Sequence, residues 1–393
     1  MSNIRTVIVG AKRTGIGSFQ GQFKDVEATH LGSAAIKGAL AHSGLSPDDV
    51  DEVIMGCVLP AGLGQAPARQ ASLYAGLPMD TGATTVNKVC GSGMKSLMLA
   101  NDLIRAGSAT IVVAGGMESM TNAPYMLPKA RGGYRMGHGQ VLDHMFFDGL
   151  QNPYDQQMMG QFAELCADKY SFSREQQDDF SITSITRSME AMDNGQFAAE
   201  IVPVTVKSRR GETVVATDEE PPRCNIDKIP NLRPAFRKEG TVTAANSSKI
   251  SDGAAALVVM SAEDAQQRGI TPLAGIVAHA THSQEPEWFT TAPVGAIASL
   301  LEKTGWTKED VDLFEINEAF ATVTMAAIKE LDLDHDKVNV NGGACSLGHP
   351  IGASGARIVV TLINAMQQRG LKRGIAALCI GGGEATAIAV ELP

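Results

Sequence analysis

The chain has 393 residues, a length that predicts two or three domains. Hydrophobic residues make up 44% of it, enough for a large core, and its formal charge of −10 argues against binding to nucleic acid or to an anionic membrane. No apolar run is long enough to cross a membrane, and no two of the six cysteines are spaced as a zinc-binding or redox pair. These features predict a soluble, cytoplasmic α/β protein.

Short β-branched runs alternate with helical patterns along the first part of the chain. Between the runs, a helical stripe from Met94 to Ile104 ends at Gly107. The runs look buried on both faces, which predicts mixed sheets covered by helices. The predicted strands are residues 6–11, 50–56, 83–87, 110–116 and, after a long interruption, 256–261.

The second part of the chain repeats the first at a nearly constant offset. Gly44 begins the segment GLSPDDVD, and Gly305 begins the similar segment GWTKEDVD, so the offset is 305 − 44 = 261. Collinear matches follow between residues 92–93 and 354–355, 111–119 and 377–385, and 252–261 and 383–392. The repeat predicts two duplicated halves, residues 1–120 plus 250–271 and residues 272–393, with residues 121–249 inserted as a loop domain.

The insertion contains one clear helix start. Ser173 and Gln176 have the spacing of a capping box, which predicts a helix running towards Gly195. The stretch 207–238 carries eight Lys and Arg against five Asp and Glu, a net charge of 8 − 5 = +3 in an acidic protein. This stretch is either a mixed, solvated surface or a binding site for a phosphorylated ligand. Arg223 lies within it.

Cys90 lies in the segment NKVCGSGMKS, where a strand-like run ends and a helix begins. The dipole and free N–H groups of a helix N-terminus favour a thiolate, so we expect a lowered pKa and a reactive sulfur. The alternative is a buried structural cysteine, which is the usual role of this residue.

Three further residues stand beside glycine-rich turns or strand ends. His349 lies in NGGACSLGHPIGASGAR, a stiff turn that suits a base acting on a nucleophile, although a lone histidine is more often structural. Cys379 ends a strand that runs into three glycines, whose N–H groups can point at an oxyanion. Asn317 lies in EINEAFA, where it is either a helix N-cap or a holder of a water or donor for a carbonyl oxygen.

These four segments together make the chain similar to the thiolase family over essentially its whole length. NKVCGSGMKS, NEAFA, GGACSLGHPIGASGAR and CIGGGEATA resemble the family's active-site segments, in order and at similar spacing. The closest resemblance is to its acetyl-CoA C-acetyltransferase members, which join two acetyl-CoA into acetoacetyl-CoA and CoA, or cleave the product, through an acyl-cysteine. The duplicated halves and the insertion resemble the family's N-terminal, C-terminal and loop domains.

The resemblance implies a role for each matched residue. Cys90 corresponds to the nucleophile, His349 to the base that activates it, and Cys379 to the acid and base that moves the substrate α-proton. Asn317 corresponds to the residue that positions an oxyanion-hole water, and the backbone N–H groups of Cys90 and Gly381 to the other oxyanion hole. The implied substrate and CoA contacts are Ser248, Met159, Phe320 and Arg223.

The resemblance also implies partners and leaves alternatives open. The substrates would be acetyl-CoA, acetoacetyl-CoA and CoA in fatty acid metabolism, with no metal or cofactor, in a homodimer or homotetramer. Met158 stands where short-chain members commonly carry histidine, and Glu384 adds a charge near the site. The alternatives are a 3-ketoacyl-CoA thiolase of broader range, a decarboxylating ketoacyl synthase, a non-catalytic acyl-CoA or lipid-binding relative, and a cysteine peptidase.

Overall fold

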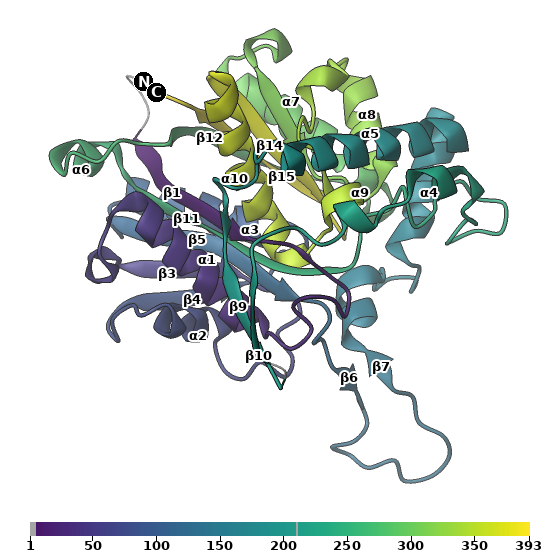
Figure 1. Cartoon of the computed structure of the whole chain (residues 1–393). Helices are drawn as coiled ribbons and strands as arrows, with labels where there is room; N and C mark the ends of the chain where they lie inside the picture. The colour runs from purple at the N-terminus through teal and green to yellow at the C-terminus, as the bar shows by residue number, and fades with distance from the viewer. Residues whose placement is uncertain (1–4, 210) are drawn as a thin grey trace.

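The computed structural model describes residues 5–209 and 211–393, so residues 1–4 of the predicted first half and Arg210 of the basic stretch lie outside the described residues. An eleven-stranded sheet runs through the molecule (Figure 1). Its order is β13 (Leu313–Ile316), β14 (Arg373–Ile380), β15 (Glu384–Glu391), β12 (Ala274–Ser283), β1 (Thr6–Thr14), β11 (Ser251–Ser261), β5 (Ile111–Ser119), β3 (Glu52–Gly56) and β4 (Gly82–Val86). The short strands β2 (Gly17–Ser18) and β8 (Ile201–Val202) pair with β11 and β1.

The two halves of this sheet have the same strand order. From the middle outwards, the first half reads β1-β11-β5-β3-β4 and the second β12-β15-β14-β13. Val338 bridges Phe314 in parallel where a fifth strand of the second half would lie. The duplicated mixed-sheet fold predicted from the sequence is confirmed. The sequence did not indicate that the two sheets join, which they do where β1 pairs with β12 at Val7 and Ile8.

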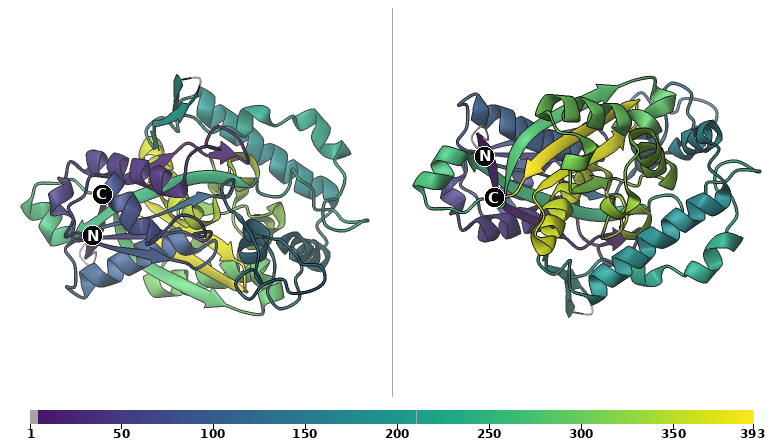
Figure 2. Two further views of the ribbon diagram at one scale, coloured as in Figure 1. Left: turned by 90° about the horizontal axis from the view of Figure 1, so that it is seen from below. Right: turned by 90° about the horizontal axis from the view of Figure 1, so that it is seen from above.

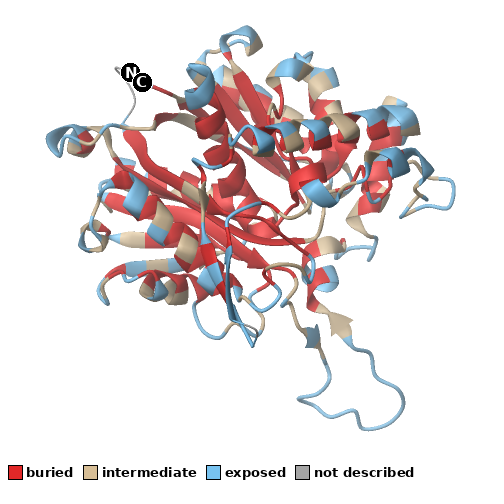
Figure 3. Ribbon diagram, in the orientation of Figure 1, coloured by how far each residue is buried: buried red, intermediate tan, exposed pale blue. Residues whose placement is uncertain are grey.

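Helices cover both halves and also fill the space between them (Figure 2). Helices α1 (Ala28–Ser43) and α2 (Pro67–Tyr74) cover the outer face of the first half, and α7 (Ala292–Thr304) and α8 (Ala321–Leu331) cover that of the second. Helices α3 (Ser92–Arg105) and α10 (Ile351–Arg369) pack on each other between the sheets. Every residue of α10 from Ile351 to Met366 is therefore buried, and burial is concentrated in these central layers (Figure 3).

The repeated segments fold alike at the level of single hydrogen bonds. Gly44 ends α1 at φ 72°, and Gly305 ends α7 at φ 70°, the left-handed conformation that glycine adopts without strain. Asp51 and Asp312 each accept two backbone N–H groups at the start of the neighbouring strand, β5 or β14. The similarity at offset 261 therefore reflects two copies of one helix–turn–strand unit.

The segment between β5 and β11 contains α4 (Met159–Tyr170), α5 (Arg174–Asp193) and three short pairs of strands or bridges. Helix α5 begins at the predicted capping box of Ser173 and Gln176 and stops before Gly195, as expected. Residues 127–141 form a projecting arm beyond β6 (Tyr125–Met126) and β7 (Leu142–Asp143), and β9 (Val204–Ser208) pairs with β10 (Gly211–Val215) (Figure 1). The exact domain boundaries stay a prediction.

The remaining elements are short connections. They are α6 (Ala262–Gln267), α9 (Ala344–Leu347), the π-helical turn η2 (Met145–Leu150), and the 3-10 turns η1 (Pro47–Asp49), η3 (Pro221–Arg223), η4 (Ile226–Asn231), η5 (Pro286–Thr291), η6 (Lys308–Asp310) and η7 (His335–Lys337). Over residues 5–209 and 211–393, no helix combines the length and apolar character needed to cross a membrane.

Candidate active site

A pocket of about 460 Å³ brings together several residues singled out in the sequence. Its walls come from the insertion, from residues just before β11, and from the turns that precede α8 and α10. The predicted residues that line it are Arg223, Ser248, Met159, Phe320 and His349. The lining is largely apolar, as in most sites that bury a small ligand.

Cys90 lies beside this pocket, in the turn between β4 and α3. Helix α3 begins at Ser92, so the cysteine precedes the first helical turn. Val89 before it has a positive φ of 46°, an uncommon conformation for a β-branched residue that turns the chain sharply. Cys90 is half-buried and packs on an apolar cluster that includes Met120 and Ile351, both of which line the pocket.

The expectation of a lowered pKa at Cys90 is wrong. Removal of the sulfur from water raises the pKa of the Cys90 thiol to about 11, and the buried carboxylate of Glu118 acts in the same direction. The backbone N–H groups of Gly381 and of Cys90 itself favour the thiolate but only partly offset the burial. The resting residue is therefore a neutral thiol, and it needs a base.

His349 presents one free ring nitrogen for that purpose. The turn before it requires Gly348, whose φ is 110° and whose Cβ would lie 2.1 Å from Ser251 Oγ. Ser354 Oγ donates to the carbonyl of Pro350 at 2.9 Å and lies 2.6 Å from His349 Nδ1, so the Nδ1–H donates to it. The other nitrogen, Nε2, is buried and has no partner among the described residues, so its lone pair can accept a proton.

The surroundings of His349 keep its ring neutral. The side chain is only 5% exposed, and burial lowers the pKa of His349 to about 3, with a further contribution from the positive charge of Arg357. The Cys90 thiol and the His349 imidazole are thus both uncharged in the resting protein.

Cys379 lies at the end of β14 and is fully buried. It packs in a cluster with Phe320 and Met159, two of the pocket-lining residues. Burial raises the pKa of the Cys379 thiol well above its usual range, and a thiolate at Cys90 would raise it further. Cys90 and Cys379 come from different halves of the chain.

The turn after Cys379 is made by glycines. Gly382 and Gly383 have φ values of 96° and 90°, and a Cβ on Gly383 would lie 2.3 Å from the carbonyl oxygen of Gln284. The backbone N–H of Gly381 in this turn lowers the pKa of Cys90 and so favours its thiolate. Backbone donors held in this way can stabilise charge that develops at the attacked carbonyl.

Asn317 lies behind the histidine, where β13 ends. Its side chain is 1% exposed, its Nδ2 lies 3.5 Å from His349 Nδ1, and its Oδ1 lies 3.5 Å from Arg357 Nη2. The helix that follows, α8, has Phe320 as its N-cap, so the alternative role of Asn317 as the cap of that helix is wrong.

The predicted substrate contacts occupy different parts of the pocket. Met159 begins α4 and lies beside Gly381, and Phe320 packs edge to face with Phe236 at 6.1 Å between ring centroids. Ser248 donates its backbone N–H to Ala319. Arg223 lies at the rim, where its guanidinium bonds to Ser18 Oγ at 2.9 Å and to Glu219 at 3.1 Å.

The chain gives two matches to models of known families. Residues 6–263 match the thiolase N-terminal domain, and residues 270–392 match the thiolase C-terminal domain. The chain belongs to the thiolase family. The decisive observation is that the two matches together cover nearly the whole chain, including all four active-site segments.

Relatives of known name support the same assignment. An acetyl-CoA acetyltransferase of Chromobacterium violaceum is 51% identical over 392 residues, 99% of this chain and 100% of its own. One of Cupriavidus necator is 50% identical over 387 residues, 98% of each chain. The crystal structure of the Bacillus anthracis acetyl-CoA acetyltransferase has a TM-score of 0.97 at 43% identity and covers 99% of both chains.

Several residues of this thiolase site were missed in the sequence. Ser354 and Arg357 follow His349 within one or two helical turns. They lie in the same sequence motif as His349, and this proximity could have marked them as site residues. Phe236 lies against Gly160, where a Cβ would be 2.3 Å from its ring. No local pattern marks Phe236, because its role depends on packing between residues far apart in the chain.

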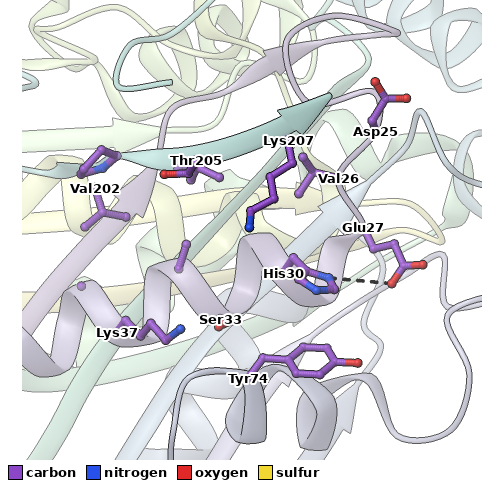
Figure 4. A pocket seen from close by; sticks show the side chains of 14 residues that line it. Asp25, Val26, Glu27, His30, Ser33, Lys37, Tyr74, Val202, Thr205 and Lys207 are labelled. Carbon is purple, nitrogen blue, oxygen red and sulfur yellow. Dashed lines mark ion pairs between the residues drawn. The ribbon is translucent and has the colours of Figure 1, made fainter. Parts of the chain in front are cut away.

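A larger hollow, of about 1070 Å³, lies elsewhere, between α1 and the strands β8 and β9 (Figure 4). His30 stacks on Tyr74 with ring centroids 4.7 Å apart and lies 3.8 Å from Glu27. Lys37 and Lys207 also line it. None of the predicted site residues lines this hollow, so the smaller pocket carries the candidate chemistry.

Proposed function

We propose that this thiolase is an acetyl-CoA acetyltransferase, which condenses two acetyl-CoA to acetoacetyl-CoA and CoA and also catalyses the reverse thiolysis. The observation that carries this proposal is that His349 lines one pocket while Cys90 and Cys379 each pack on residues that line it. The relatives of about 50% identity that bear this name support the choice of substrate.

The first half-reaction transfers an acetyl group to Cys90. His349 Nε2 takes the thiol proton as the sulfur attacks the thioester carbonyl, and the N–H groups of Cys90 and Gly381 stabilise the oxyanion. As the tetrahedral intermediate collapses, the C–S bond to CoA breaks and Cys379 gives its proton to the departing thiolate. Acetyl-Cys90, imidazolium and the Cys379 thiolate remain.

The second half-reaction forms the carbon–carbon bond. The Cys379 thiolate removes the α-proton of a second acetyl-CoA. The His349 imidazolium and the water that Asn317 is proposed to position stabilise the enolate oxygen. The enolate carbon attacks acetyl-Cys90, the thioester bond breaks, and the released Cys90 thiolate recovers its proton from His349. Every proton and charge is returned in these steps, and that the enzyme needs no metal or cofactor stays a prediction.

We propose a short acyl chain as the preferred substrate. Met158, Met159, Phe236 and Phe320 crowd the lining of a pocket of about 460 Å³, which leaves little room for a long acyl group beside the pantetheine. Ser248 and Arg223 remain the proposed CoA contacts. The guanidinium of Arg223 forms an ion pair with the carboxylate of Glu219, which weakens its attraction for a phosphate.

We further propose a homodimer or homotetramer in the cytoplasm, acting in fatty acid metabolism. Strand β4 forms one edge of the sheet, and its sequence GATTV contains neither charge nor proline to block pairing with another chain. The exposed arm 127–141 is the proposed contact with further copies. All six cysteines are free thiols, which fits a reducing compartment.

The test is loss of acetoacetyl-CoA absorbance in the presence of CoA, repeated with 3-ketoacyl-CoA substrates of four, six, eight and ten carbons. We expect the highest kcat/KM at four carbons and no turnover by Cys90→Ala. Equal kcat/KM at ten carbons would instead favour the broader-range thiolase, and no turnover of any substrate by the wild type would favour a non-catalytic binding protein.

A further inference from the structure

The two backbone donors of the proposed oxyanion hole come from opposite halves of the chain. Cys90 lies in the turn between β4 and α3, and Gly381 lies in the turn between β14 and β15. No covalent segment joins these turns directly, so their separation depends on contacts between them. Catalysis by such donors requires their positions to be held within about half an ångström.

One contact between the turns is apolar and close. A Cβ on Gly91 would lie 2.4 Å from Ile380 Cδ1, so the absence of a side chain at residue 91 lets the turns approach each other. A Cβ on Gly381 would lie 3.7 Å from Val89 Cγ1, ordinary contact distance. Apolar packing brings the turns together but restrains sliding of one past the other only weakly.

The second contact is ionic and directional. The ammonium of Lys88, two residues before Cys90, pairs with a carboxylate oxygen of Glu384, the first residue of β15. The other oxygen of Glu384 accepts a hydrogen bond from Ser283 Oγ on β12 at 3.1 Å, which fixes the carboxylate to the sheet. Lys88 is fixed as well, because its backbone N–H donates to Ser92 Oγ at 2.8 Å.

We propose that the Lys88–Glu384 ion pair is a clamp that sets the position of the Cys90 N–H relative to the Gly381 N–H. Both are therefore positioning residues for acyl transfer, an inference that rests on the function proposed above. Neither side chain lines the pocket or touches the reacting atoms. The pair joins residues 296 positions apart in the sequence, and it accounts for the charge that Glu384 adds beside the site.

The clamp contributes to geometry more than to stability. The side chains of Lys88 and Glu384 are 22% and 34% exposed, and ion pairs with this much water contact add little to the folding free energy. A displacement of catalytic groups by about 1 Å, in contrast, can slow a reaction about 100-fold. Loss of the pair is therefore expected to separate activity from stability.

The experiment compares Lys88→Met, Glu384→Gln and the double variant, with Lys95→Met as the matched control. Lys95 lies on α3, and its charge also acts on Glu384. Its substitution therefore changes the electrostatic potential at Glu384 but leaves the Lys88–Glu384 ion pair in place. We expect kcat to fall about 10- to 100-fold in each single variant, with KM within twofold. The double variant should be no slower than the slower single one, because both remove the same contact. Lys95→Met should stay within twofold of wild type.

A second readout does not depend on which thioester is the substrate. The same two N–H groups favour the Cys90 thiolate, so loss of the clamp should move the pH profile of Cys90 alkylation by iodoacetamide to higher pH. The exchange variant Lys88→Glu/Glu384→Lys should recover at least tenfold of the kcat lost in Lys88→Glu. A folded Lys88→Met with wild-type kcat and an unchanged alkylation profile would overturn the clamp and leave the proposed function standing. The clamp would also be overturned if the alkylation profile of Lys88→Met were unchanged and the exchange variant failed to restore kcat.

Discussion

At the scale of single residues, the neutral state of Cys90 and His349 is the feature that distinguishes this site from a preformed thiolate. Burial raises the pKa of Cys90 to about 11 and lowers that of His349 to about 3. Each group alone disfavours its charged form because water is excluded from the site. In the proposed mechanism, proton transfer is therefore coupled to attack on the thioester, where the oxyanion-hole donors stabilise the new charge.

This protonation state predicts the pH dependence of Cys90 alkylation. The thiolate is the reactive form, so with a pKa near 11 the rate with iodoacetamide should rise about tenfold per pH unit from pH 7 to 10. Cys224 is also half-buried and serves as the internal control, since acetyl-CoA should protect Cys90 and not Cys224. A plateau at neutral pH in peptide mapping would indicate a thiolate–imidazolium pair instead.

The roles of His349 and Cys379 are separable by substitution. His349→Ala should slow both acetylation of Cys90 and condensation by about 10²- to 10⁴-fold, because the nucleophile loses its base. Cys379→Ser should slow condensation to a similar degree but acetylation less than tenfold, because CoA thiolate leaves readily without an acid. Rapid-quench measurement of acetyl transfer distinguishes the steps, and equal losses in acetylation would refute this division.

At the scale of elements, we propose that the N-terminus of α4 limits the length of the acyl chain. Met159 is the first residue of α4, and the next residue, Gly160, packs tightly against Phe236. Met159 and Phe236 therefore cannot move aside easily. Met159→Ala should therefore raise kcat/KM for six- and eight-carbon substrates by about 10-fold or more relative to four carbons. The exposed Met79→Ala is the control. An unchanged chain-length profile would mean that α4 does not set the limit.

At the scale of the whole molecule, a buried ion network joins the first half to the insertion. Arg13 on β1 is fully buried and bonds to Asp218 through two nitrogens at 2.7 and 2.8 Å and to Glu200 at 2.5 Å. Arg13→Met leaves two buried carboxylates without their cation and should lower the free energy of unfolding by about 3–5 kcal/mol. In urea titrations, the control Lys24→Met, at an exposed lysine, should change it by less than about 1 kcal/mol. Similar shifts for both would argue against the network.

The sequence predicted the local elements well because their signals are local. The β-branched runs became β1, β3, β4, β5 and β11, and the box at Ser173 began a helix as expected. The repeat also predicted the duplication, since each copy carries its own glycine stop and capped turn. What could not be predicted depends on distant packing: the junction of the two sheets, the raised pKa of Cys90, and the pairing of Lys88 with Glu384.

The central claim is that Cys90 carries the acetyl group between two CoA thioesters. The direct measurement is mass spectrometry of the protein after a brief reaction with acetyl-CoA and an acid quench. We expect one acetyl group on the peptide containing Cys90, its removal when CoA is added before the quench, and no acetyl group on Cys90→Ala. An acetyl group on another cysteine, or condensation without any acetylated Cys90, would contradict the account.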